Sequence, residues 1–466
     1  MYPTIAHAGH VLRTGTTTSV ELTRSALAMA DALDPDLGVY VTRLDDQALA
    51  QAARADAQLA AGDDRGPLHG IPLGVKDIIA MRGADTTAQS LVLDRAWGRE
   101  RGDAPVVARL RAAGAVITGK LTTMEFAIGV PDVAKPFPVP RNPWDVDTWA
   151  GGSSSGAASG IAAGLVLGAI GTDTGGSVRI PASYCGVSAL KPTFGRVPKS
   201  GCVPLGYTYD HVGPMARSAE DCALLLGVLA GHDASDPMCA DRPVDDYVSG
   251  LTGDLTGLRI GVDPLLGKVS RPVPEVDRLL AAAVRELAAA GAEVVGVDLP
   301  LYAEMSDVTT MGFQAEAFAY HRADLRARWH DYGAGTRSFI VNGALFSAAD
   351  YVQMQRVRRL VARNVAALFD DVDVIVTPTM TGVAPPVDGL TVSDLGDTLQ
   401  TLYWNATGSP ALSVPMGFSD NGLPLGLQVV GRHFDEATVL AVGHAYQQRS
   451  DWHLRTPPLL DRALEG

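Results

Sequence analysis

Apolar residues along this chain recur at helical spacing in some segments and form short extended runs in others. They repeat at helical spacing over residues 22–33, directly after Thr18 and Glu21, which have the spacing of a capping box. A second helix is predicted over 45–61, and the apolar run 71–75 predicts a strand.

The same alternation continues through the rest of the chain. Helices are predicted over 103–113 and 276–290, and strands over 115–118, 258–262, 293–297 and 372–377. Residues 300–360 hold several aromatic side chains without strand signals, so this segment is predicted to be mainly helical. Helices that alternate with strands indicate an α/β fold. No internal repeat or linker is evident, and residues 1–466 are expected to form a single domain.

The segment 151–186 differs from its surroundings because it is rich in Gly, Ser and Ala and nearly free of charge. A flexible linker has such a composition, but a linker would not carry apolar residues such as Ile161 and Ile170. We therefore predict a packed segment. Its stretch Ala157–Ile170 is too short to cross a bilayer and is predicted to be a buried helix.

Composition narrows the possible classes of function. Of the 466 residues 47% are hydrophobic, and the net charge of −14 argues against a nucleic-acid partner, because phosphate binding needs a basic face. The four cysteines form no C-x-x-C pair and the ten histidines form no H-E-x-x-H, so neither a metal nor another cofactor is expected. Few cysteines and no secretory signal predict a cytoplasmic protein. The expected partner is a small-molecule substrate, with no nucleic acid and no membrane, and a homodimer is left open.

Lys76 is the first candidate for chemistry, because it lies in the run Gly74-Val-Lys-Asp77 at the end of an apolar strand. Burial disfavours the ammonium form of a lysine and lowers its pKa, which would make Lys76 a base near neutral pH. The alternative interpretations are an ion pair with Asp77 or a side chain that extends to water.

Two serine clusters accompany the lysine. The first, Gly151-Gly-Ser-Ser-Ser-Gly156, offers hydroxyl groups that donate and accept protons, although one of its serines could simply cap the helix that follows. The second, Gly171–Pro181, places Ser177 behind two glycines. A tight turn there would aim several backbone N–H groups at one point, as an oxyanion hole requires, and an exposed turn serine is the alternative.

Other catalytic patterns are weaker. Ser188-Ala-Leu-Lys191 matches S-x-x-K, but the companion motifs S-D-N and K-T-G are missing. His211 would be needed for a Ser-His-Asp triad, and a histidine bonded to neighbouring backbone is the preferred interpretation. The sequence has no G-x-S-x-G elbow and no phosphate-binding G-x-x-x-x-G-K-[ST] loop.

The lysine and serine clusters resemble the amidase signature family, whose defining stretch corresponds to Gly151–Pro181. Further matching segments are Leu190–Arg196, Asp210–Arg217, Val374–Thr379, Gly408–Pro415 and Gly422–Gln428. The resemblance covers most of the chain and is weakest over about 220–370. It implies a large, mixed, mostly parallel central sheet covered by helices on both faces. It also implies a catalytic core over about 65–220 and a variable substrate-pocket region over about 300–405.

Carried over by position, the resemblance implies that Lys76 is the base, Ser153 a bridging serine held by a cis peptide, and Ser177 the nucleophile. Neutral Lys76 would take a proton from Ser153, which takes one from Ser177, and Ser177 would form an acyl-enzyme. The implied oxyanion hole consists of the backbone N–H groups of Thr174, Gly175, Gly176 and Ser177. Because all three catalytic residues are present, a degenerate binding module is disfavoured.

The cleaved bond is less specified than the nucleophile. A neutral aryl or acyl amide is the first prediction, and a carbamate or ester is the alternative, because each gives an oxygen ester on serine. An amidotransferase subunit is disfavoured, since that branch typically has Arg-Gln-Pro-Ala where this chain has Arg179-Ile-Pro-Ala182. Apolar or aromatic residues predicted to line the substrate pocket, with core packing as the alternative for each, are Met124, Phe126, Tyr207, Phe313 and Trp404.

Overall fold

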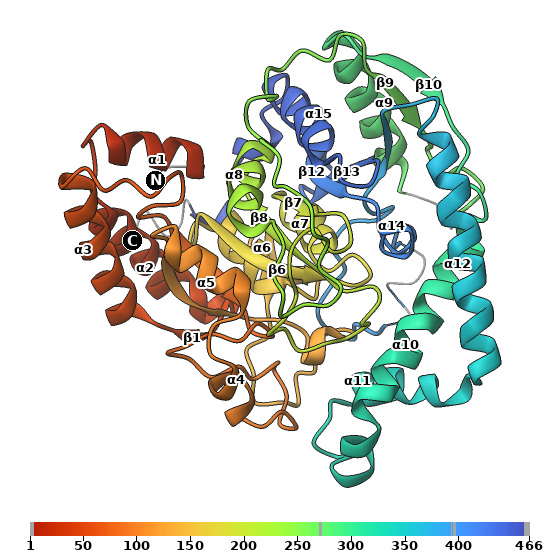
Figure 1. The fold of residues 1–466 in the computed structure, drawn as a ribbon, viewed down its shortest axis with the longest axis horizontal. Coiled ribbons are helices and arrows are strands. Elements are labelled where there is room, and N and C mark those ends of the chain that lie inside the picture. The colour runs from red at the N-terminus through yellow and green to blue at the C-terminus, as the bar shows by residue number, and fades with distance from the viewer. Residues whose placement is uncertain (1–3, 270–272, 393, 395–397, 461–466) are drawn as a thin grey trace.

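An eleven-stranded sheet forms the centre of the computed structural model, which describes residues 4–269, 273–392, 394 and 398–460 (Figure 1). From edge to edge its strands are β1 (Tyr40–Arg43), β3 (Val116–Leu121), β2 (Pro72–Lys76), β6 (Gly168–Asp173), β8 (His211–Ala216), β7 (Ser188–Lys191), β12 (Ala411–Phe418), β13 (Pro424–Gly431), β11 (Val374–Pro378), β9 (Arg259–Val262) and β10 (Glu293–Gly296). A separate two-stranded sheet pairs β4 (Arg141–Asn142) with β5 (Asp145–Trp149).

Parallel pairs occupy the two outer parts of the large sheet, and antiparallel pairs occupy its middle. Strands β3, β2 and β6 run parallel, as do β11, β9 and β10, and β1 is an antiparallel edge strand. Every neighbouring pair from β6 to β11 is antiparallel. The short turn between β12 and β13 permits only antiparallel pairing. The predicted α/β fold with one large mixed sheet is confirmed.

Helices cover both faces of the sheet, and each face has its own apolar core. On one face lie α2 (Ser19–Leu37), α6 (Ser155–Ala162) and α7 (Arg179–Cys185). On the other lie α5 (Pro105–Ala112), α8 (Ala219–Leu229), α9 (Pro274–Ala289) and α15 (Glu436–Gln448). Because strand side chains alternate between faces, Ala169 of β6 packs in the first core and Ile170 in the second. On the side of the molecule that carries β1 lie the helices α1 (Ile5–Arg13), α3 (Asp45–Ala60) and α4 (Ala96–Arg101) (Figure 1).

The helix predicted over Ala157–Ile170 is wrong in its second half. Helix α6 ends at Ala162, and the chain enters strand β6 at Gly168. Gly164 has a φ of 75°, which turns the backbone between the two elements. Every residue of this segment except Leu167 is buried, so its apolar pattern did not distinguish a helix from a strand.

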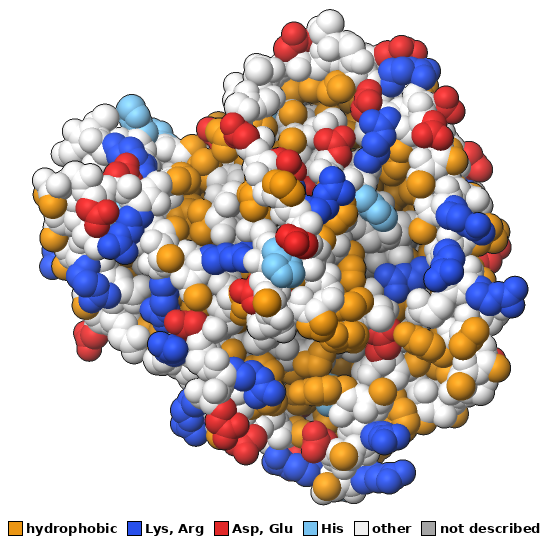
Figure 2. Space-filling view, in the orientation of Figure 1, with side chains coloured by type: hydrophobic (Ala, Val, Ile, Leu, Met, Phe, Trp, Pro, Cys, Tyr) orange, Lys and Arg blue, Asp and Glu red, His pale blue; other side chains and the backbone are white. Residues whose placement is uncertain are grey.

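The predicted helical region near residues 300–360 is confirmed and forms a group of three helices at one side of the molecule. These are α10 (Tyr302–Ala327), α11 (Ala334–Val341) and α12 (Ala348–Leu368), followed along the chain by α14 (Leu402–Thr407). In Figure 1 they lie on the side opposite α1 and α3. Figure 2 shows that this face of the molecule is hollowed beside α10 and that apolar side chains gather in the hollow. Among the helices described, none is long and apolar enough to cross a bilayer.

Candidate active site

Lys76 is the last residue of β2, and its side chain is fully buried. Its Nζ lies 2.7 Å from Ser153 Oγ, 2.9 Å from Ser154 Oγ and 2.8 Å from Thr172 Oγ1. Burial lowers the pKa of Lys76 to about 7, an effect that two nearby carboxylates oppose only in part. Since hydroxyl groups rather than carboxylates surround Nζ, the amine can be neutral and accept a proton near pH 7.

The neighbouring Asp77 is not the partner of Lys76. Its carboxylate lies 3.2 Å from the buried Lys120 Nζ and accepts a hydrogen bond from the Thr87 N–H. Successive side chains of extended backbone point in opposite directions, which separates the two neighbours. The ion-pair interpretation of the lysine motif therefore does not describe this fold.

The serine cluster before α6 contacts the lysine through two of its members. The peptide bond between Gly152 and Ser153 is cis, as the family resemblance implies. Ser154 precedes α6 without capping it, and its Oγ instead donates to the Thr172 carbonyl at 3.2 Å. The Ser154 N–H donates to the Ser177 carbonyl at 3.0 Å, which ties this cluster to the second serine segment.

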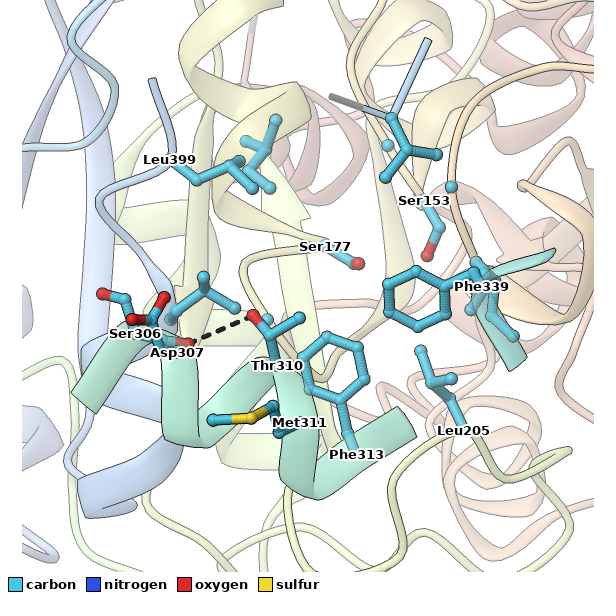
Figure 3. Close-up of a pocket in the computed structure, with 18 of the residues that line it drawn as sticks. Ser153, Ser177, Leu205, Ser306, Asp307, Thr310, Met311, Phe313, Phe339 and Leu399 are labelled. Carbon is cyan, nitrogen blue, oxygen red and sulfur yellow. Dashed lines mark hydrogen bonds between the residues drawn. The ribbon is translucent and has the colours of Figure 1, made fainter. Parts of the chain in front are cut away.

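Ser177 lies in the turn between β6 and α7. Figure 3 shows its hydroxyl turned toward the same cavity as the hydroxyl of Ser153. The structure contains the hydrogen bond between Lys76 and Ser153, which is the first link of the predicted relay. Within the described chain, Ser177 Oγ has no hydrogen-bond partner, so the second link is not formed in this conformation.

The backbone around Ser177 presents three N–H groups rather than four. In the described part of the chain, the N–H groups of Thr174, Gly175 and Ser177 have no acceptor. The N–H of Gly176 instead donates to Asp173 Oδ1 at 2.8 Å. Gly176 has a φ of 127°, where a side chain would also collide with Thr401. The turn can thus bind an oxyanion through three donors.

A buried charged network supports this turn, and the residues in it were not among the predicted site residues. Arg179 donates to both carboxylate oxygens of Asp173 at 3.0 Å, and to Asn405 Oδ1 at 2.6 Å and Gln428 Oε1 at 2.7 Å. Burial alone would raise the pKa of Asp173, but the Arg179 guanidinium holds it well below its usual range. The available signal was a pair of opposite charges inside an otherwise nearly uncharged run.

Asp210 supports the other side of the turn and was also missed. Its carboxylate accepts from Thr174 Oγ1 at 2.5 Å and from the N–H groups of Leu205 and Gly206 at 3.0 Å each. These contacts connect the oxyanion turn with the loop that supplies Leu205 to the cavity wall. No local pattern marks such a contact, because Asp210 and Thr174 are distant in sequence.

The cavity beside Ser177 has a volume of about 540 Å³ and is mainly apolar. Ser153 and Ser177 lie on one wall, and Phe313 of α10 and Phe339 of α11 lie across from them (Figure 3). Its size is in the range of sites that bind small organic molecules. Among the lining residues that the structure describes, none is a lysine or an arginine.

The five predicted pocket residues fall in different places. Phe313 lines this cavity. Met124, Phe126 and Trp404 lie buried in the apolar cores, which was the alternative interpretation for each. Tyr207 is 48% exposed and borders a second, smaller cavity. Residue type alone did not distinguish residues that line the cavity from residues that pack in the core, because both are apolar side chains.

The competing catalytic patterns are held in structural contacts. Ser188 Oγ donates to the Arg217 carbonyl, whereas Lys191 Nζ contacts Pro192 O and His211 Nε2, so the S-x-x-K pair does not meet. His211 Nδ1 lies 2.6 Å from the Tyr209 carbonyl, in agreement with a backbone-bonded histidine. Across the described residues no group of three His, Cys, Asp or Glu side chains could hold a metal ion.

Comparison with known proteins finds amidase-related matches along most of the chain. The family profile described as Amidase matches residues 21–440. A glutamyl-tRNA(Gln) amidotransferase subunit of Roseiflexus sp. is 42% identical, with 98% of each chain covered. A Mycobacterium bovis protein described as amidase AmiD is 40% identical, with 98% of this chain and 96% of that protein covered.

Two solved structures share the whole fold. The peptide amidase of Stenotrophomonas maltophilia has a TM-score of 0.84 at 32% identity, with 98% of each chain covered. A bacterial aryl acylamidase of the amidase signature family has a TM-score of 0.87 at 26% identity, with 99% of this chain and 98% of that chain covered.

Proposed function

The chain belongs to the amidase signature family, whose enzymes act on amide C–N bonds, and from this premise we propose that it hydrolyses a neutral aryl or acyl amide through an acyl-enzyme on Ser177. The observation that carries the proposal is the 2.7 Å hydrogen bond between the buried Lys76 Nζ and Ser153 Oγ. It places a base whose pKa is lowered to about 7 beside a hydroxyl that faces the same cavity as Ser177.

The proposed reaction moves one proton through two hydroxyl groups. Neutral Lys76 accepts the proton of Ser153, and Ser153 accepts the proton of Ser177 as Ser177 Oγ attacks the substrate carbonyl. The second transfer needs Ser177 Oγ to come within hydrogen-bond distance of Ser153 Oγ. Catalytic hydrogen bonds are often unformed without substrate and close when it binds.

The oxyanion turn stabilises the negative charge that develops on the carbonyl oxygen. Within the described residues, three backbone N–H groups of the turn have no acceptor and can donate to it, and each such donor is worth roughly 10²–10³ in rate. The proton then returns through Ser153 to the leaving amine. Water enters, loses a proton along the same relay, and hydrolyses the ester on Ser177.

The cavity supports a neutral reacting group rather than a free α-amino acid. Glutamine would bring a carboxylate, and no described lining residue is a lysine or an arginine that could bind it. Desolvating an unpaired carboxylate is costly, so binding of free glutamine is disfavoured. Ile180 also lines the cavity, at the position where the amidotransferase branch typically has Gln. These features favour a stand-alone enzyme.

Two other functions have support of their own. Hydrolysis of a carbamate or ester would use the same relay and cavity, because the acyl or carbamoyl group would reside on the same Ser177 oxygen. A role within an amidotransferase complex is supported by the 42% identity to the Roseiflexus protein over nearly the full chain. We favour the stand-alone enzyme over this role because no described lining residue is a lysine or an arginine.

Replacement of the nucleophile tests the proposal. We expect Ser177→Ala to abolish turnover and to prevent labelling by a fluorophosphonate probe, because no oxygen remains to form the covalent bond. Ser188→Ala is the matched control, since Ser188 belongs to the competing S-x-x-K pattern and should leave labelling unchanged. Labelling of folded Ser177→Ala at the rate of the unaltered enzyme would refute the assignment.

A further inference from the structure

The apolar cavity has a polar strip on α10, formed by Ser306, Asp307 and Thr310. Figure 3 shows these side chains together on α10, on the wall that lies across from Ser177. Asp307 is exposed, whereas Ser306 and Thr310 are half-buried, so the strip reaches from the cavity to the solvent. The proposed mechanism makes no use of the strip.

The two hydroxyl groups of the strip each donate a hydrogen bond within α10. Ser306 Oγ donates to the Tyr302 carbonyl at 3.2 Å, and Thr310 Oγ1 donates to the Ser306 carbonyl at 3.1 Å, as the dashed line in Figure 3 marks. Serine and threonine in helices commonly bond in this way. What they leave toward the cavity are oxygen lone pairs. Together with the Asp307 carboxylate, the strip therefore offers hydrogen-bond acceptors.

Asp307 has no evident role in holding the fold. It forms no ion pair or side-chain hydrogen bond within the described residues. A carboxylate in the first turn of a helix could cap free N–H groups. Helix α10 begins at Tyr302, so Asp307 lies after the first turn and has no such role. It is also the one charged side chain among the described residues that line the cavity.

We propose that the polar strip is a subsite for a positively charged, hydrogen-bond-donating group, such as a primary ammonium, at the end of the substrate remote from the scissile bond. This inference rests on the proposed hydrolysis at Ser177 and specifies its substrate class. The substrate has an apolar aryl or alkyl body, a neutral carbonyl at the serine, and an amine at its far end. A terminal carboxylate is disfavoured, because it would face the Asp307 carboxylate.

The test compares substrates that differ only at the far end. An anilide with a terminal ammonium group, its isosteric methyl analogue and its carboxylate analogue are hydrolysed by the unaltered enzyme and by Asp307→Asn. We expect the unaltered enzyme to have the highest kcat/KM for the ammonium substrate. Asp307→Asn should lower that value about two- to five-fold, the range of an exposed charge pair, and leave the value for the methyl analogue unchanged.

Two controls assign the effect to the subsite. Glu304→Gln removes a charge from an exposed position of the same helix that does not line the cavity, and it should preserve the preference. Added salt should reduce the preference of the unaltered enzyme and have little effect in Asp307→Asn. The inference is overturned if Asp307→Asn and the unaltered enzyme show the same ratio of kcat/KM for the ammonium substrate to kcat/KM for the methyl analogue. Turnover of the methyl analogue in that case would leave the proposed hydrolysis intact, whereas failure on all three would count against the hydrolysis itself.

Discussion

At the scale of single residues, the feature that determines the proposed chemistry is the environment of one amine. Lysine in water is a cation with a pKa near 10.4. At the end of β2 the amine of Lys76 loses its hydration and gains three hydroxyl neighbours without a carboxylate in contact. The Asp77 carboxylate that could have kept it charged binds Lys120 instead. The polypeptide thus separates two adjacent residues into two electrostatic environments.

The pH dependence of acylation follows from this environment. Because burial lowers the pKa of Lys76 to about 7, the neutral base is the minor form below that pH and the major form above it. We therefore expect kcat/KM for a neutral anilide to rise about tenfold per pH unit below 7 and to level off above it. Stopped-flow release of the aniline over pH 5 to 9 measures the profile. A rate independent of pH through this range would contradict the assignment.

Removal of the Lys76 amine tests the same assignment by mutation. We expect Lys76→Ala to slow acylation by roughly 10²–10⁴, the usual contribution of a positioned base, while the thermal unfolding transition persists. The fold should survive because groups that contact the Lys76 amine also bond to each other. Ser154 Oγ donates to the Thr172 carbonyl and keeps this bond when the amine is removed. Activity within a few-fold of the unaltered enzyme would show that another group serves as the base.

At the scale of elements, the cavity wall depends on how the start of α11 is held. Glu125 of the short helix η1 (Glu125–Ala127) accepts from Ser90 Oγ and from the Gly333 N–H, each at 2.7 Å. Gly333 directly precedes α11, which carries Phe339 into the cavity. A single buried carboxylate therefore fixes the start of the helix that closes this wall.

Loss of this attachment should affect binding more than chemistry. We expect Glu125→Ala to raise KM several-fold for an anilide while kcat changes less, because two buried donors lose their acceptor and α11 loosens. Glu125→Gln retains an acceptor for the Gly333 N–H and should restore most of the affinity. Steady-state kinetics of both variants measures the difference. Equal losses in kcat and an unchanged KM would show that Glu125 supports the catalytic turn instead of the wall.

At the scale of the whole molecule, the open question is whether the chain acts by itself. No described lining residue of the cavity provides a positive charge for the carboxylate of a free amino acid. We expect the isolated chain to hydrolyse one acyl–aryl pair presented as anilide, carbamate and ester, and to release little ammonia from glutamine. Chromatographic product analysis and an ammonia assay measure both. Glutamine hydrolysis that appears only with a co-purified partner would favour the amidotransferase function.

The sequence by itself determined the α/β class and the elements with clear local patterns, and it indicated the candidate residues of the proposed relay. The repeat over residues 22–33 predicted α2 with its cap, and the apolar run before Lys76 predicted β2. The glycines around Ser177 marked a tight turn. Each of these signals lies within a few neighbouring positions, where spacing and residue type limit the possible conformations.

Only the tertiary structure decided which distant residues meet. It divided Ala157–Ile170 into a helix and a strand, paired Asp77 with Lys120, and brought Asp210 to Thr174. It placed Phe313 at the cavity while Met124 and Trp404 became core. Burial and pairing across the sheet are properties of the packed chain, and a buried apolar side chain has the same local pattern whether it faces a substrate or another helix.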